Sequence, residues 1–142
     1  MTREETARRV ECALENHRKG YNCAQSVICA FADKTDLDEQ LLFRLTEGMG
    51  LGMGGMEGTC GAIAAAAVLS GLKGSTGNLE APDSKGRTYK DSRACLAAFK
   101  EKNGSVICRD LKGVETGRVL RSCDDCIADA VEIIAGKFYE EN

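Results

Sequence analysis

The chain has 142 residues, of which 43% are hydrophobic and 29% charged, a balance that suits a single globular domain with a buried core. Its 19 Lys and Arg against 22 Asp and Glu give a net charge of -3, and no basic stretch interleaved with aromatic residues occurs, so we expect no nucleic-acid partner. The charged first residues and the shortness of the apolar segment 60–72 predict a cytoplasmic protein with no signal peptide and no stable membrane insertion.

The most unusual feature of the composition is its 8 cysteines. This share is above ordinary usage but below the roughly 8–10% that marks a small secreted disulfide scaffold. In a reducing compartment, such thiols bind metal, carry out redox chemistry or pack in the core. The eight cysteines can therefore be divided among these three roles.

In the first half of the chain, helix signals alternate with glycine. Thr2 and Glu5 form the pattern of a capping box, which predicts a helix over about 3–19 that ends before Gly20. Asn22 is placed to cap a second helix that runs to about Phe31. A third helix is expected from residues 36–39, which again resemble a capping box, to about 45.

A glycine-rich stretch, 48–61, then precedes the most apolar segment of the chain. Seven glycines make this stretch a poor helix interior, so we expect a loop. Thr59 is placed to cap a helix over 60–72, whose small residues are apolar on every face. Such an Ala-rich helix must lie at the centre of the fold, with its neighbours packed close.

Three further helices are predicted in the second half, after a solvated loop at 73–87. Thr88 resembles the start of a capping box for a helix that ends at 103–104, and Ser105 is placed to cap a short helix to Leu111. Ser122 opens a final helix that carries one apolar stripe to Phe138. With six or seven helices and no series of strand signals, we predict an all-α, bundle-like single domain over 1–142.

Four cysteines fall near predicted helix starts. Each of the first three directly follows its expected cap, and the fourth lies three residues after Ser105; they are Cys23, Cys60, Cys123 and Cys108. Free backbone amides and the helix dipole favour negative charge there, which lowers the pKa of a thiol and activates it as a nucleophile or ligand. One such cysteine is most simply a buried, inert thiol, but four together predict that the helix ends converge on one pocket.

Cys123 and Cys126 form the only C-x-x-C of the chain. This spacing allows a disulfide across one helical turn or two ligands to one metal ion. A strong zinc prediction would need a second such pair. The neighbouring Asp124 and Asp125 oppose thiolate formation at Cys123 and partly cancel the helix dipole.

These cysteine segments resemble the family named for its C_GCAxxG_C_C signature. The resemblance rests on 21–25 (YNCAQ), 59–62 (TCGA), 104–111 (GSVICRDL) and the late cysteine that heads a helix. By position it implies Cys23, Cys60, Cys108 and Cys123 as the functional set, with Cys126 as an addition in this protein. Ala65 departs from the pattern, which has glycine there. The family resemblance implies redox activity but no established reaction or substrate.

The remaining cysteines and the single histidine are assigned no chemistry. Cys12 lies opposite an apolar stripe and is expected to be exposed, whereas Cys29 and Cys95 are expected in the core. His17 is expected to act as a helix C-cap, which gives no support to a histidine-dependent triad.

Two other patterns in the glycine-rich stretch are given a structural interpretation. The G-x-G-x-x-G of 50–55 follows no strand, so we read it as a loop of close approach rather than a dinucleotide site. Three methionines, Met49, Met53 and Met56, are expected to pack.

Three hypotheses follow. The first is a thiol redox protein, with Cys60, Cys108 and Cys123 as principal candidates, that acts as a thiol-disulfide oxidoreductase on a redox partner protein or a small thiol or disulfide and needs no cofactor. The second is a binding or electron-transfer module in which the cysteines hold zinc or an iron–sulfur cluster. The third is a structural homodimer. The first is favoured.

Overall fold

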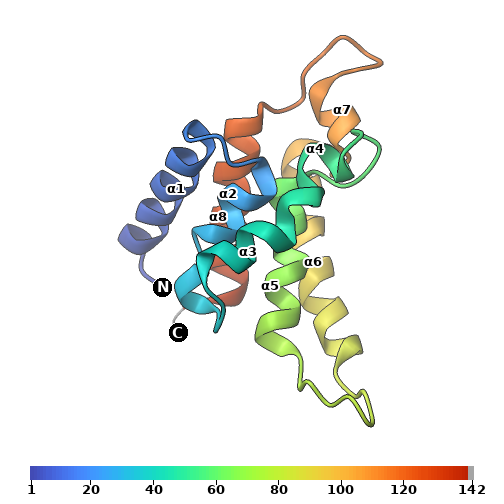
Figure 1. Cartoon of the computed structure of the whole chain (residues 1–142). Coiled ribbons are helices and arrows are strands. Elements are labelled where there is room, and N and C mark those ends of the chain that lie inside the picture. The colour runs from blue at the N-terminus through green and yellow to red at the C-terminus, as the bar shows by residue number, and fades with distance from the viewer. Residues whose placement is uncertain (141–142) are drawn as a thin grey trace.

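The computed structural model describes residues 1–140, and its elements confirm the all-α prediction. Figure 1 shows the helices in chain order. The helices are α1 (Arg3–Arg18), α2 (Cys23–Cys29), α3 (Glu39–Thr46), α4 (Gly50–Met53), α5 (Gly61–Gly74), α6 (Lys85–Asn103), α7 (Cys108–Lys112) and α8 (Cys123–Phe138), with 3-10 turns η1 (Ala32–Lys34) and η2 (Glu47–Met49). No strand occurs within the described residues; Thr59 and Ile107 form an isolated antiparallel bridge.

Helix α5 is the centre of the bundle, as its composition predicts. It packs against α2, α6 and α8 (Figure 1). Six consecutive residues at its start are buried, from Gly61 to Ala66, and they include Ile63 and Ala65 with no exposed surface. Small side chains allow these close approaches, which stabilise a helix whose every face is apolar. Its last turn emerges from the core, where Leu72 is 44% exposed.

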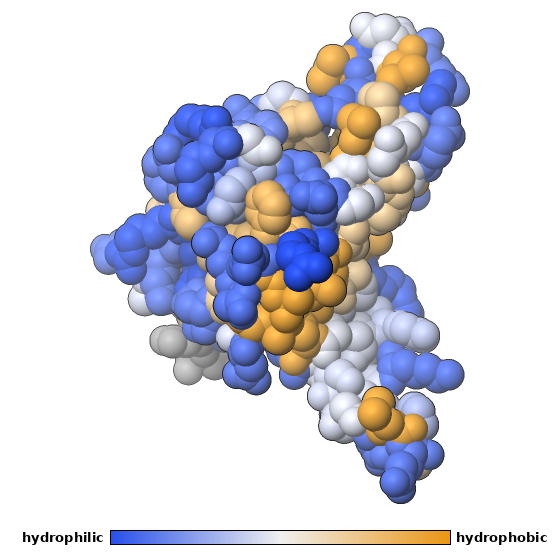
Figure 2. Space-filling view, in the orientation of Figure 1, coloured by the Kyte–Doolittle hydropathy of each residue, from blue (hydrophilic) through white to orange (hydrophobic). Residues whose placement is uncertain are grey.

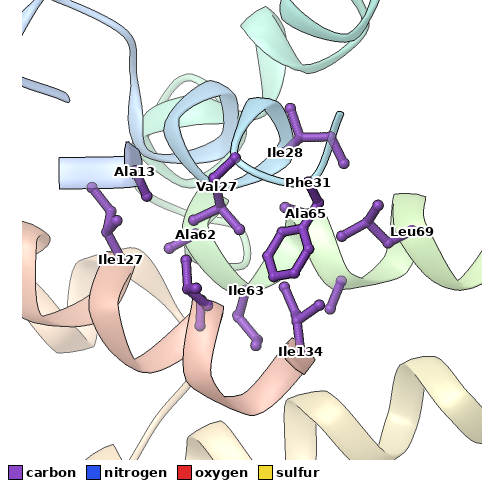
Figure 3. Close-up of a cluster of buried hydrophobic side chains, with 14 of the residues drawn as sticks. Ala13, Val27, Ile28, Phe31, Ala62, Ile63, Ala65, Leu69, Ile127 and Ile134 are labelled. Atoms are coloured by element: carbon purple, nitrogen blue, oxygen red, sulfur yellow. The ribbon is translucent and has the colours of Figure 1, made fainter. Parts of the chain in front are cut away.

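The hydrophobic core lies between α5 and its neighbours. Figure 3 shows Val27, Phe31, Ile63 and Ile134 directed toward one another from different elements of the chain. Each of these side chains is fully buried. Burying a side chain of this size contributes about 1.5–3 kcal/mol. This core holds the N-terminal ends of α2, α5 and α8 in fixed relation to one another.

Several helix starts agree with the predicted caps. Thr2 and Asn22 form capping boxes with Glu5 and Gln25, and the Ser122 hydroxyl accepts a hydrogen bond from the backbone N of Asp125. These side chains satisfy amides that would otherwise lack a partner at the start of each helix.

Other helix starts differ from the prediction. Helix α3 is capped by Asp38 alone, which accepts from Leu41 N, and not from residue 36. Helix α6 begins at Lys85, three residues before the expected start at Thr88, so the preceding loop is shorter than expected. Its cap residue, Ser84, makes no side-chain capping bond to the helix, and its Oγ instead accepts a hydrogen bond from the backbone N of Thr76.

The α5–α6 pair extends away from the rest of the bundle. In Figure 1 the two helices run side by side to a loop at the lower right. Figure 2 shows hydrophobic side chains at this free end, where Leu79 is 92% exposed. Among the described residues, no helix is long and apolar enough to cross a membrane.

Candidate functional site

Five cysteines line one cavity, which has a volume of about 180 Å³. These are all the candidate site residues of the sequence, namely Cys23, Cys60, Cys108, Cys123 and Cys126. The wall also contains His17, Asn22, Leu51, Leu111, Lys112 and Arg121. The expected convergence of distant thiols is therefore present in the fold, and the cavity is large enough for a small ligand only.

Three of the cysteines occupy the first residue of a helix, and for Cys23 and Cys123 this is the position that the spacing from Asn22 and Ser122 predicts. Cys23 begins α2, Cys108 begins α7 and Cys123 begins α8. Cys60 differs, because it is the cap residue of α5 and the helix begins at Gly61. All four thiols therefore stand at the N-terminal ends of helices.

The cap expected for α7 was wrong. Its cap residue is Ile107, which makes no side-chain capping bond. Ser105 instead accepts from the backbone N of Ile107 at 3.0 Å and donates to the Asp110 carboxylate at 2.9 Å. This turn shapes the segment that leads into α7.

Backbone pairing joins the glycine-rich stretch to the start of α7. Cys60 N donates to Val106 O at 2.6 Å, Cys108 N donates to Gly58 O at 3.0 Å, and Arg109 N donates to Met56 O at 2.9 Å. The segments 56–60 and 106–109 thus lie side by side although they are far apart in sequence. This pairing brings Cys60 and Cys108 to the same cavity wall.

Glycines allow the backbone to approach the cysteines closely. A Cβ at Gly52 would collide with Cβ of Cys108, and a Cβ at Gly61 would lie 2.6 Å from Sγ of Cys23. Gly52 also has a φ of 56°, in the left-handed region. The expectation of a loop is only partly right, because the G-x-G-x-x-G stretch contains the short helix α4, in which Leu51 and Gly52 have left-handed backbone angles. Its close approach to Cys108 is as expected, and within the described residues no strand precedes it.

Ala65 and the methionines of the glycine-rich stretch can now be compared with their predicted roles. Ala65, where the family pattern has glycine, is fully buried in the core, so the methyl group has a place in the packing. Of the methionines expected to pack, Met53 is 48% exposed, and both Met53 and Met56 have a positive φ.

The sulfur atoms of Cys23, Cys60 and Cys126 are neighbours. Interaction with Cys60, followed by burial, raises the pKa of Cys23 far above its usual value. Interaction with Cys126, followed by burial, raises the pKa of Cys60 to about 12 although Cys23 opposes the shift. Cys23 and Cys60 are therefore held protonated at neutral pH, so the expected activation by the helix ends is outweighed at these two thiols.

Cys108 shows the same correction for a different reason. Burial raises the pKa of Cys108, and the nearby ammonium of Lys112 only partly opposes it. Cys108 is only 4% exposed. Desolvation of a thiolate therefore exceeds the favourable effect of the short helix α7.

Lys112 contacts Cys123 directly. Its Nζ donates a hydrogen bond to Sγ of Cys123 across the cavity wall. Although burial lowers the pKa of Lys112, the contact with Cys123 and the proximity of Cys108 and Cys23 raise it overall. A charged ammonium therefore faces the thiol that heads α8. Sequence reasoning missed Lys112; its one signal is that it lies one helical turn after Cys108.

Arg121 is a second cavity residue that sequence reasoning missed. It donates to the buried carboxylate of Asp129 through Nε at 2.9 Å and Nη2 at 3.0 Å. Lys102 donates to the same carboxylate at 2.7 Å from α6. This network attaches the segment that precedes Cys123 to α8 and α6. No spacing in the sequence announces a contact between α6 and this segment.

His17 also lies at the cavity and does not serve mainly as the expected C-cap. Its Nδ1 lies 2.7 Å from Oδ1 of Asp124, so it joins the end of α1 to the start of α8. The last turn of α1 is completed instead by Lys19 N, which donates to Glu15 O and Asn16 O.

The other three cysteines lie outside the cavity lining. Cys12 is exposed, as predicted, and Cys29 and Cys95 belong to the core. Burial raises the pKa of both Cys29 and Cys95 to about 11. These two thiols are therefore protonated and inaccessible at neutral pH, in agreement with a packing role.

No group of three or more His, Cys, Asp and Glu side chains within residues 1–140 has an arrangement that could hold a metal ion. The thiols that line the cavity are all free. What the geometry provides is a set of sulfur nucleophiles and one ammonium group around a small cavity.

Comparison with known proteins agrees with the cysteine pattern. A family model described as "Putative redox-active protein (C_GCAxxG_C_C)" matches residues 21–136, which include all five cavity cysteines. No curated protein and no solved structure matches the chain significantly. Because the family model spans most of the chain and its description assigns a general redox role, the chain belongs to the C_GCAxxG_C_C family of redox-active proteins.

Proposed function

We propose that the protein is a thiol redox protein that cycles between dithiol and disulfide forms in the cysteine-lined cavity. The observation that carries this proposal is the convergence of five free thiols on one cavity of about 180 Å³. Two thiols in contact can store two electrons and release them when they form a disulfide. The family's redox description supports the same chemistry.

The proposed reaction is exchange with an external disulfide. A cavity thiolate attacks one sulfur of the disulfide, a mixed disulfide forms, and the first external thiolate leaves and takes up a proton. A second cavity thiol then attacks the mixed disulfide and releases the second external thiol. The external disulfide gains two electrons, the protein disulfide holds the oxidised state, and an external dithiol reductant restores the starting form. The chain would thus act as a thiol-disulfide oxidoreductase.

The partner in this proposal is a redox protein or a small thiol or disulfide in a reducing compartment such as the cytoplasm. The small size of the cavity favours a small partner, or one protein disulfide presented on a narrow protrusion. A homodimer is a separate prediction of the sequence, which light scattering coupled to gel filtration would test.

The test begins with protein purified without oxygen. Free thiols are titrated before and after addition of a small disulfide, and the products are mapped by mass spectrometry of peptides. We expect loss of thiols in pairs, both members from the cavity set. Cys123→Ser should abolish one pairing, whereas Cys12→Ser, which alters an exposed thiol outside the cavity, should leave every cavity pairing intact.

The same samples test the competing metal hypothesis. Thiolates are ligands for zinc and for iron–sulfur clusters, so metal content and the visible spectrum are measured before oxidation. Metal-free protein that loses cavity thiols in pairs supports the proposal. Stoichiometric zinc or absorbing iron, with thiols that do not pair on mild oxidation, would overturn it in favour of a metal-binding module.

A further inference from the structure

We infer that Cys123 is the attacking thiolate of the cavity and that Lys112 is the positioning residue that holds it in this form. The inference rests on the proposed thiol exchange and deepens it, because it assigns the first chemical step to one sulfur among five. It is carried by the contact between Nζ of Lys112 and Sγ of Cys123.

Lys112 contacts a thiol, whereas the other two basic side chains of the cavity contact carboxylates. Arg121 pairs with Asp129 and His17 lies against Asp124. No carboxylate on the described part of the chain forms an ion pair with Lys112, and its one hydrogen-bond acceptor is Cys123. Its ammonium charge is therefore available to stabilise a thiolate.

The remaining thiols of the cavity are poorly suited to the first attack. Cys60, Cys108 and Cys126 are only 7%, 4% and 3% exposed. Cys23 interacts with Cys60 through its thiol, and its pKa is raised. Cys123 is half-buried, at the first residue of α8, and thus combines access with a cationic neighbour. A disulfide that enters the cavity meets this sulfur beside the ammonium group of Lys112.

The groups that bear on the pH dependence of Cys123 line the cavity or follow Cys123 directly in the sequence. They are His17 from α1, Cys23 from α2, Cys60 at the start of α5, Cys108 and Lys112 from α7, Arg121 from the preceding segment, and Asp124, Asp125 and Cys126 from α8. The two aspartates oppose the thiolate, but Asp124 lies against His17 and Asp125 lies 3.8 Å from Arg121. Lys112 is the group of this set whose hydrogen bond reaches Sγ of Cys123.

The assigned step conserves atoms and charge. The Cys123 thiolate attacks a small symmetrical disulfide, forms a mixed disulfide, and displaces one small thiolate, which takes a proton from water. Cys126, one helical turn later, loses its proton and attacks Sγ of Cys123, and the second small thiol leaves with that proton. The small disulfide is reduced by two electrons as the Cys123–Cys126 disulfide forms.

The experiment measures alkylation of individual cysteines by iodoacetamide in the full chain, with peptide mass spectrometry as the readout. Exposed Cys12 serves as an internal reference in every sample. At pH 7 we expect Lys112→Met to slow alkylation of Cys123 relative to Cys12 by about tenfold. Lys112→Arg, which keeps the charge, should restore the rate to within about threefold of the original. Lys100→Met, on an exposed position of α6, is the matched control and should change neither rate.

The pH profile separates charge stabilisation from a merely structural role. The effect of Lys112→Met should shrink as pH rises toward about 10, because an ordinary thiol, with a pKa near about 8.5, is ionised there without a cationic neighbour. A misfolded cavity would instead alter the rate at every pH. Circular dichroism and urea unfolding verify that each variant is folded. An unchanged Cys123 rate in Lys112→Met, or a Lys112→Arg variant as slow as Lys112→Met, would overturn the inference.

A parallel assay with bis(2-hydroxyethyl) disulfide keeps the two proposals apart. If the cavity disulfide forms equally fast with and without Lys112, the inference fails while the proposed function stands. If no cavity disulfide forms even in the unaltered protein, yet Lys112 still accelerates alkylation of Cys123, the proposed function fails and the assignment of the reactive thiol stands.

Discussion

Gly61 lies directly against the sulfur of Cys23. A Cβ added at Gly61 would be 2.6 Å from Sγ of Cys23 and 2.8 Å from the carbonyl oxygen of Met49. The start of α5 therefore meets the start of α2 without an intervening side chain. This contact explains in physical terms why a glycine directly follows Cys60 in the cysteine pattern of this chain.

We expect Gly61→Ala to destabilise the protein by about 1–3 kcal/mol, because the added methyl must displace a sulfur atom and a carbonyl group. Urea unfolding measures the change. Gly71→Ala in the same helix is the matched control, since nothing lies within 4 Å of its added Cβ. That variant should instead stabilise α5 by about 0.5–1 kcal/mol. Equal effects of the two substitutions would contradict the close contact.

The Asp129 carboxylate is expected to anchor the segment that precedes Cys123. It is 3% exposed and accepts hydrogen bonds from Arg121 and Lys102. Asp129→Asn removes the charge, and because both cations are partly exposed we expect a loss of about 1–3 kcal/mol in unfolding free energy. Asp91→Asn, which breaks a half-exposed pair with Lys73, should cost less than about 1 kcal/mol. A smaller loss for Asp129→Asn than for Asp91→Asn would disprove the anchoring role.

The same carboxylate gives an expected dependence on acid. Although burial disfavours its charged form, hydrogen bonds from Arg121 and Lys102 hold the pKa of Asp129 below its usual value. Its contribution to stability is therefore present above about pH 4 and is lost as pH falls through the lower folded-state pKa. The measurement compares urea unfolding midpoints of the original chain and of Asp129→Asn between pH 5 and pH 2.5. The original chain should lose roughly 1 kcal/mol more unfolding free energy over this range than the variant. Parallel acid profiles would refute the expectation.

Buried thiols predict a loss of stability in base. Burial raises the pKa of Cys95 to about 11, whereas an unfolded cysteine ionises near about 8.5. The folded state therefore binds more protons than the unfolded state above that pH, and unfolding free energy falls as pH rises. In reducing buffer, Cys95→Ala should flatten the decline between pH 8 and 9.5, while Cys12→Ala at an exposed position should not. The readout is the urea midpoint at each pH, and an identical decline in Cys95→Ala would speak against this cause.

Local signals in the sequence predict much of the fold. Thr2, Asn22 and Ser122 cap helices as their patterns indicate, and the composition of α5 predicts its central place. Where local signals are weak the predictions fail, as at the start of α6, because Ser84 makes no capping bond to that helix. Tertiary packing, not local propensity, sets that boundary.

For the cavity, the location of the thiols could be predicted from the sequence, but their ionisation could not. The positions of cysteines close to helix caps predicted which thiols would line one cavity, since the N-terminal ends of helices can meet in a bundle. Their ionisation could not be predicted, because the pKa of Cys60 depends on a neighbour from α8 and on burial, neither of which is visible in a linear pattern. The contact of Lys112 with Cys123 likewise depends on how α7 and α8 are placed in space.

The cavity draws its sulfur atoms from position 23 through position 126, so nearly the whole chain must be synthesised before the set is complete. On the ribosome, Cys23 and Cys60 emerge first and wait for the partners supplied by α7 and α8. During that interval neither thiol has the neighbours that later shield it from oxidants. A disulfide formed at that stage between Cys23 and Cys60 would precede the arrival of Lys112 and Cys123 from α7 and α8.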